Sequence, residues 1–265
     1  MIVAIGSLQR AANGIIRSGD YSTADAPEDF IAYQPLSPDY PVVVLSGSGS
    51  ERAARATRWA IEEFEPEAIV SFGFCEATKD LPRPGDIVIA SRVINLPGTP
   101  FEWSVVDKTN SLGPDRTLLL SARTAVEIAG LDYHHGTVVT VSKLATTPGI
   151  KSWLGETVNT TAADTESFAV ASAAHEAGVP WAVVASVLDD RDFDVPSIID
   201  RVGAGPNERG ILAYIRYVSN SPLDLPALMR LGRLSTRAST SLGAFMTAFM
   251  EARAALIESQ PASKS

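Results

Sequence analysis

Uninterrupted runs of apolar residues constrain the fold of this chain more than any other feature of its sequence. Because the apolar residues in them are continuous rather than alternating, these runs predict strands that are buried on both faces. Such strands need a layer of helices on each side of the sheet, which is the α/β architecture. The runs lie at residues 2–5, 42–46, 68–73, 86–94, 137–142 and 181–188.

Helical segments separate some of these runs, and glycine and proline mark where the segments end. Gly130 follows the second helical segment, and Gly178 and Pro180 follow the third, which are stop signals at helix C-termini. We expect helices at about residues 51–64, 117–129 and 164–177.

The last third of the chain has a different pattern. From about residue 197 it reads as helical, and it ends in a stretch rich in alanine, leucine and methionine at 224–258. We therefore expect one α/β domain over residues 1–258, with a central, mostly parallel or mixed twisted sheet flanked by helices. Its C-terminal part, about 205–258, is expected to be helical, and residues 259–265 to form a flexible tail.

Composition excludes several classes of protein. With 265 residues, 45% of them apolar, the chain can bury one large core. The 22 basic and 31 acidic residues give a net charge of -9, which disfavours a nucleic-acid surface. One cysteine cannot form an internal disulfide, and with three histidines the chain has no metal-ligand cluster, so we expect no metal and a reducing compartment.

The N-terminus has no basic region ahead of its short apolar run, and no apolar stretch approaches the roughly 18 residues of a membrane helix. We therefore expect a cytoplasmic protein without stable membrane insertion.

A glycine turn joins the apolar run 42–46 to the helix expected at 51–64. Gly47 and Gly49 stand in this turn, an arrangement in which backbone N–H groups and a helix N-terminus face an anion. Arg52 occupies the position of the third glycine of a dinucleotide fingerprint, and the Lys-Ser/Thr pair of a P-loop is missing. The pattern favours a small-anion site, and a dinucleotide site or a plain turn stay open as alternatives.

An acidic run, "DDRDFD", follows the strand expected at 181–188. Its first members lie at the C-terminal end of that strand, where α/β sheets place their chemistry. A calcium loop is disfavoured because Val195 holds its glycine position and Arg201 its final glutamate position. A solvated acidic loop remains an alternative.

A second acidic group lies at the start of the helix expected at 164–177. Asp164, Thr165 and Glu166 stand where acidic residues cap a helix, and taken alone that interpretation is favoured. The histidines are scattered and no serine lies in a G-x-S-x-G elbow, so we do not expect a Ser/His/Asp triad.

Taken together, these segments resemble the nucleoside phosphorylase and methylthioadenosine/S-adenosylhomocysteine nucleosidase superfamily over roughly residues 1–200. Four segments match in order: "IGSLQR", "LSGSGSERAARAT", "EAIVSFGFCEATKDLPRPGDIVIASRVI" and "AADTESFAVASAAHEAGVPWAVVASVLDDRD". The C-terminal third, "DVPSIIDRVG" through "DLPALMRLGRLSTRA", is similar to the hopanoid-associated phosphorylases, which release adenine from adenosylhopane.

The resemblance implies cleavage of a ribosyl N-glycosidic bond through a cationic, oxocarbenium-like ribosyl group. By position, Asp189 matches the family aspartate that protonates or hydrogen-bonds the purine N7, and Glu166 matches the glutamate that holds the ribose hydroxyls. A carboxylate near the sugar and a proton for the departing base both lower the barrier. Asp189 needs a raised pKa to donate a proton near neutral pH.

The resemblance also implies inorganic phosphate as a co-substrate, with no cofactor. Hydrolytic nucleosidases carry a glutamate where this chain has Ala11, so phosphorolysis is favoured and hydrolysis is the alternative. An arginine binds phosphate through a charge-assisted fork. The residues matched to the phosphate site are Gly6, Arg10, Gly47, Gly49 and Arg52.

The chain departs from the family at several pocket positions. The family sequence G-S-A-G-G is here Gly73-Phe74-Cys75-Glu76-Ala77, Thr165 replaces a methionine, and Ala185 replaces an arginine. These changes leave an unusual substrate, an altered reaction and lost activity open, and Phe74 is either a stacking residue or an ordinary core residue. We expect substrate contacts from Thr165, Phe74, Cys75 and Leu144.

The expected substrate is a small-molecule nucleoside, an adenosine derivative with an apolar 5′ extension. Family resemblance also implies a homodimer or homohexamer.

Overall fold

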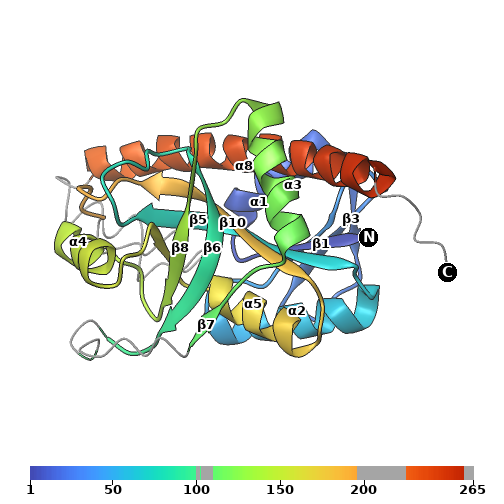
Figure 1. The fold of residues 1–265 in the computed structure, drawn as a ribbon, viewed down its shortest axis with the longest axis horizontal. Coiled ribbons are helices and arrows are strands. Elements are labelled where there is room, and N and C mark those ends of the chain that lie inside the picture. Colours follow the sequence, from blue (N-terminus) through green and yellow to red (C-terminus); the bar gives the residue numbers. More distant parts are fainter. Residues whose placement is uncertain (100–101, 103–109, 196–224, 260–265) are drawn as a thin grey trace.

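Helices and strands follow one another through the chain around one mixed sheet (Figure 1). The computed structural model describes residues 1–99, 102, 110–195 and 225–259. The strands are β1 (Ile2–Gly6), β2 (Tyr21–Ala24), β3 (Ile31–Pro35), β4 (Val42–Leu45), β5 (Ala68–Ala77), β6 (Ile87–Leu96), β7 (Ser111–Leu112), β8 (Tyr133–Val141), β9 (Ala162–Asp164) and β10 (Trp181–Asp189). The helices are α1 (Gln9–Ser18), α2 (Ser50–Phe64), α3 (Arg116–Ala129), α4 (Pro148–Thr157), α5 (Ser167–Glu176) and α8 (Leu225–Ser259).

Strand β5 lies at the centre of the sheet and has three neighbours. Its first half pairs with β1, the end of its second half pairs with β9, and β10 runs parallel to it along its other edge. Since β10 also pairs with β6, β6 with β8, and β8 with β9, five strands close into a ring. The ring brings the ends of β5, β9 and β10 together, beside α4.

Strands β4, β1, β5 and β10 are parallel neighbours in the sheet. Their C-terminal ends therefore meet at one edge, which is where open α/β sheets bind ligands. The glycine turn follows β4 at this edge, and the acidic run follows β10.

Helices cover both faces of the sheet (Figure 1). Helices α1, α3 and α8 pack on one face of the sheet, over an apolar cluster that includes Ala4, Val70 and Phe245. Helices α2 and α5 pack on the other face. The single α/β domain, its mixed sheet and its C-terminal helix are therefore as the sequence predicts.

The contact between α1 and α8 depends on two glycines. A Cβ atom on Gly14 would lie 1.8 Å from the carbonyl oxygen of Ser239, and one on Gly243 would lie 2.4 Å from the carbonyl oxygen of Gly14. The backbone N–H of Gly14 also donates to the Ser239 hydroxyl at 2.9 Å. The two helix backbones therefore approach more closely than any side chain at these positions permits.

Most predicted elements are confirmed, and one helix start is wrong. The helices expected at 51–64 and 117–129 and the helical stretch at 224–258 are present to within a residue or so. The helix expected from residue 164 begins at Ser167, because Ala162–Asp164 form β9 between β5 and β8. Residues 196–224, which include Arg201, and residues 260–265 of the expected tail lie outside the described residues.

Candidate active site

Asp189 lies at the end of β10, and its side chain is 1% exposed. Its Oδ2 atom forms a buried ion pair with Nζ of Lys151, and its Oδ1 atom is buried without a hydrogen-bond partner. Burial raises the pKa of Asp189 to about 6, while the positive charge of Lys151 acts in the opposite direction. An aspartate with such a pKa can hold a proton close to neutral pH.

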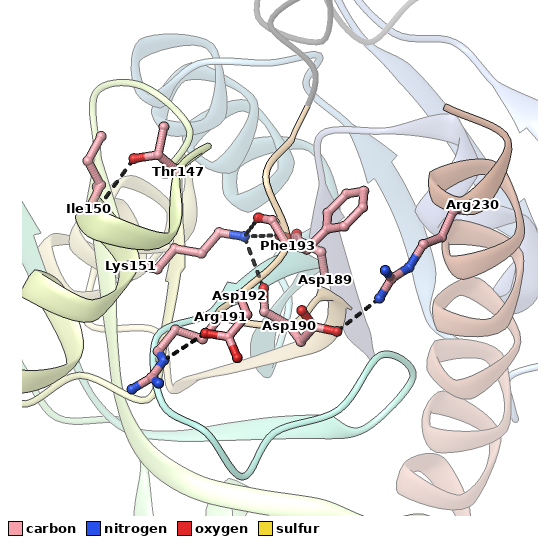
Figure 2. Close-up of polar contacts among 9 residues, drawn as sticks. All are labelled: Thr147, Ile150, Lys151, Asp189, Asp190, Arg191, Asp192, Phe193 and Arg230. Atoms are coloured by element: carbon pink, nitrogen blue, oxygen red, sulfur yellow. Dashed lines mark hydrogen bonds and ion pairs between the residues drawn. The ribbon is translucent and has the colours of Figure 1, made fainter. Parts of the chain in front are cut away.

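Lys151 comes from α4, which starts at Pro148 behind the capping side chain of Thr147. The lysine side chain is fully buried, and its ammonium group has three acceptors around it (Figure 2). Besides Asp189, it donates to the carbonyl oxygens of Asp190 at 3.1 Å and Phe193 at 2.8 Å. Lys151 therefore fixes both the catalytic candidate and the backbone of the loop that follows it.

Helix α8 approaches the same loop from the opposite side (Figure 2). Arg230 pairs with Asp190 at 3.1 Å, and its guanidinium carbon lies 4.7 Å from the centre of the Phe193 ring. The acidic run is thus anchored between α4 and α8, so it is not a freely solvated loop in its first half.

Glu166 lies at the start of α5 and reaches across to the glycine turn. Its Oε1 atom accepts a hydrogen bond from the backbone N–H of Gly49 at 2.9 Å, and the side chains of Thr165 and Ser7 also bond to it. Burial raises the pKa of Glu166, and these hydrogen bonds lower it in part. The side chain does not cap α5, so the capping interpretation is wrong for Glu166.

The anion that faces the glycine turn is therefore part of the protein itself. Gly49 is the N-cap residue of α2, so the Glu166 carboxylate lies at the N-terminus of that helix, where the helix dipole favours negative charge. The hydroxyl of Ser50 adds a second link by donating to the carbonyl oxygen of Thr165 at 2.7 Å. The turn holds the carboxylate that the family resemblance assigns to the ribose.

The two arginines matched to the phosphate site do not converge. Arg52 donates to the carbonyl oxygens of Ser46 at 2.8 Å and Asp29 at 2.6 Å, and its guanidinium packs on Gly47, whose φ is +71°. Arg10 donates to the carbonyl oxygen of Gly232 on α8 at 2.8 Å. In this structure both groups bind backbone rather than line one anion site.

The other predicted site residues lie at varied depths. Cys75 is buried, and Phe74 is half-buried and packs against the α1, α3 and α8 side of the sheet. Leu144 and Thr165 are half-buried in the segments after β8 and β9. Gly6 is buried at the end of β1, where its carbonyl oxygen accepts the Ser46 N–H at 2.9 Å.

Asp164 supports the segment that carries Glu166. Its Oδ1 atom accepts a hydrogen bond from Thr140 at 2.7 Å, and its Oδ2 atom accepts one from the hydroxyl of Ser167. Burial raises the pKa of Asp164 to about 6, against these hydrogen bonds. Asp164 thus joins β8, β9 and the first turn of α5.

A cavity of about 600 Å³ lies beside Asp190, and none of the predicted site residues lines it. Its walls carry charges of both signs, including Arg83, Arg237 and the pair formed by Asp86 and His134 at 2.9 Å. No three His, Cys, Asp or Glu side chains in the described part of the chain gather as a metal site would require. None of the described helices is long and apolar enough to cross a bilayer.

The fold is that of an α/β enzyme, and its candidate active site carries the buried Asp189 and the partly buried Glu166 at the shared edge of the parallel strands. The sequence profile of the Phosphorylase superfamily matches residues 18–203, and the chain belongs to this family. The family and the enzyme class predicted from the sequence are thereby confirmed.

Relatives and solved structures agree with this assignment. A 5′-methylthioadenosine/S-adenosylhomocysteine nucleosidase of Shewanella halifaxensis is 29% identical over 205 residues, which is 74% of this chain and 89% of the relative. The nucleosidase of Neisseria meningitidis in complex with methylthio-immucillin-A has a TM-score of 0.70 at 18% identity, covering 94% of this chain and 97% of that one. A futalosine hydrolase of Helicobacter pylori has a TM-score of 0.71 at 12% identity, with the same coverage. These structural likenesses confirm the fold.

Lys151 and the burial of Glu76 are the features of this region that sequence reasoning missed. The lysine lies in "TTPGIKSW", where no repeat or motif marks it. Glu76 is visible in the sequence as a departure from the family pattern, but its depth follows from the pairing of β5 with β9 and β10.

Proposed function

We propose that this enzyme cleaves the N-glycosidic bond of a purine nucleoside of the adenosine type. The observation that carries the proposal is the placement of Glu166 and Asp189 at one sheet edge, each in an environment that suits its role. Glu166 is held by hydrogen bonds at a helix N-terminus and would bind the ribose hydroxyls. Asp189, with a pKa of about 6, would donate a proton to the purine N7 as the bond breaks.

These two roles divide the stabilisation of the transition state. Positive charge develops on the ribosyl group while negative charge develops on the purine. The attraction between a carboxylate at the ribose hydroxyls and the ribosyl group becomes stronger as that group becomes cationic. A proton from Asp189 neutralises the departing base. The difference between the environments of the two acids allows one to act as acid while the other binds.

We propose phosphate as the nucleophile. The position at which hydrolytic nucleosidases carry a water-activating glutamate is Ala11, which is fully buried in α1 and has no group to accept a proton. Arg10, next to it, is exposed, and its guanidinium donates to a backbone carbonyl oxygen, which a phosphate can replace as an acceptor. The products would be adenine and a ribose 1-phosphate derivative.

Hydrolysis is the second candidate. The relatives named above are nucleosidases and a hydrolase, and both Arg52 and the N–H of Gly49 already have partners in this structure. Catalytic impairment is a third candidate, because Asp189 is shielded from solvent and paired with Lys151.

The resemblance of the C-terminal third to the hopanoid-associated phosphorylases supports an adenosine derivative with an apolar 5′ extension as the substrate. Of that third, the structure describes α8, which reaches the Asp190 loop through Arg230. Comparing cleavage of adenosine, 5′-methylthioadenosine and a 5′-alkyl adenosine tests this choice. A preference for adenosine itself would contradict it.

One assay separates the three candidates. The enzyme is incubated with each adenosine derivative in the presence and absence of phosphate, and free adenine and sugar phosphate are measured. Phosphorolysis predicts adenine only with phosphate, in equal amount with the sugar phosphate. Adenine released without phosphate indicates hydrolysis. Nucleoside binding by calorimetry without turnover, unaffected by Asp189→Asn, indicates an impaired homologue.

A further inference from the structure

Three ionisable side chains are buried together where α4 covers the ends of β5 and β10. Lys151 is 0% exposed, Asp189 1% and Glu76 5%. The proposed cleavage assigns a role to Asp189 alone. Two carboxyl groups and one ammonium group are therefore shielded from solvent together, and their charges must largely be balanced among themselves.

The strand register places the two carboxyl groups side by side. Glu76 of β5 is the Cα partner of Asp189 of β10, just after an irregularity that follows Val187. Partnered residues on neighbouring strands have Cα atoms about 5 Å apart, and the negative charge of Asp189 acts on the Glu76 carboxyl group. Each of the two carries one buried oxygen without a hydrogen-bond partner, Oε2 of Glu76 and Oδ1 of Asp189.

The missing hydrogen-bond partners of both oxygens are accounted for if a proton lies between them. Buried polar atoms in native proteins almost always have partners, and two acceptors cannot bond without a hydrogen. A single proton on either oxygen makes that oxygen a donor and the other its acceptor. Both exceptions to hydrogen-bond pairing among the described buried side chains are then removed at once.

The charge balance also indicates that one of the two carboxyl groups carries a proton. Lys151 compensates one carboxylate, and the next positive group, Arg230, is half exposed and pairs with Asp190 instead, so a second buried carboxylate would have no buried counter-charge among the described residues. Burial and the charge of Asp189 raise the pKa of Glu76 well above its ordinary value, and Lys151 opposes them. The other groups that face the cluster are Asp164 from β9, the Cys75 thiol of β5, whose pKa burial also raises, Asp190, and Arg230 from α8.

We propose that Glu76 and Asp189 share one proton, that Lys151 balances the one remaining negative charge, and that the shared proton is the one that leaves with the purine. The proposal rests on the proposed function for its last part. Asp189 is the catalytic residue, and Glu76 and Lys151 are positioning residues that set its protonation.

The proton transfer balances in the following way. As the bond between the ribose carbon and the purine breaks, its electron pair goes to the purine, and N7 takes the proton of Asp189. The pair has then given up its one proton, and Glu76 and Asp189 are both carboxylates beside the Lys151 ammonium group. Solvent water returns a proton after the purine leaves, which restores the starting charge.

Two substitutions are expected to move the alkaline limb of the pH–rate profile in opposite directions. In Glu76→Gln a neutral amide replaces the second carboxyl, so Asp189 loses its proton more easily and the limb moves to lower pH by about one unit or more. In Lys151→Met the balancing positive charge is gone, so Asp189 keeps its proton longer and the limb moves to higher pH. The matched controls are Glu156→Gln and Lys79→Met, exposed or partly exposed side chains that should leave the limb in place.

Infrared titration tests the shared proton without any need for activity. The wild-type protein should show the C=O stretch of a protonated carboxyl group at neutral pH, and Glu76→Gln should lose it while Glu156→Gln retains it. Absence of this band from the wild type, or its persistence in Glu76→Gln, overturns the shared proton. If the band behaves as expected but the limb stays fixed in both variants of an active enzyme, the delivery of this proton to the purine is overturned. An inactive wild type with the expected band rejects the proposed function and leaves the shared proton supported.

Discussion

Replacing Lys151 by methionine should destabilise the protein strongly, and by an amount that depends on pH. Methionine keeps most of the volume of the lysine stem but removes the positive charge that pairs with Asp189. Removing one partner of a buried ion pair costs about 3–5 kcal/mol because the other charge stays buried without compensation. This is a large part of the total stability of a typical domain.

The pH dependence follows from the pKa of Asp189. Burial raises it to about 6 even with Lys151 present, so without the lysine it lies higher still. A folded-state pKa above the unfolded value means that protonation stabilises the folded state, and this stabilisation is lost as the pH rises through the folded pKa. A rise of two units in the pKa of Asp189 corresponds to about 3 kcal/mol of stability. Much of the stability lost in Lys151→Met at higher pH should therefore be regained at about pH 5, where Asp189 is protonated.

Urea unfolding at about pH 5 and about pH 8 measures both effects. The double variant Lys151→Met with Asp189→Asn should regain most of the stability lost at the higher pH, because no charge is then left buried. Lys79→Met, which removes a lysine bonded to Asn159 at 2.8 Å near the surface, should change stability by about 0.5 kcal/mol or less. A loss below about 1 kcal/mol that is equal at the two pH values would refute the reasoning.

Three further predictions concern single residues. Gly14→Ala should lower the free energy of unfolding, measured with heat or urea, by at least about 2 kcal/mol, because its Cβ would lie 1.8 Å from the Ser239 carbonyl oxygen. The control Gly149→Ala, which has open space around it, should be neutral or slightly stabilising. Asp189→Asn should lower kcat about 100-fold or more, and retention of wild-type kcat would remove it from the role of acid. Glu166→Gln should lower kcat/KM about 10- to 100-fold, and because burial raises the pKa of Glu166, wild-type activity should begin to fall on acidification at a pH above that of an ordinary glutamate.

The sheet could be predicted from the sequence because its strands are encoded locally. Continuous apolar runs indicate buried strands, and glycine signals indicate where α2 and α3 begin or end. The three residues of β9 carry no such signal. They form a strand only because β5 and β8 flank them. Asp164, expected at the start of a helix, therefore ends β9, and Glu166 lies between β9 and α5.

The site was predictable in part. Residue types and family resemblance indicated Glu166 and Asp189. Asp189 lies at the strand end where it was expected, and Glu166 reaches the glycine turn through Gly49. The hydrogen-bond partners of Arg52 and Arg10 could not be predicted, because no sequence pattern shows that backbone carbonyl oxygens lie within reach of their guanidinium groups. Lys151 was hidden for a similar reason: lysine is rarely buried, and only the approach of α4 to the end of β10 creates its environment.

A crystal structure with adenine and phosphate bound tests the central claim most directly. The account predicts adenine with N7 at hydrogen-bond distance from a carboxyl oxygen of Asp189, and phosphate on the same side as Glu166, with Arg10 turned from the Gly232 carbonyl oxygen toward the anion. Adenine bound instead in the cavity between Arg83, His134 and Arg237, away from Asp189, would contradict the assignment of Asp189 as the acid and of this sheet edge as the active site.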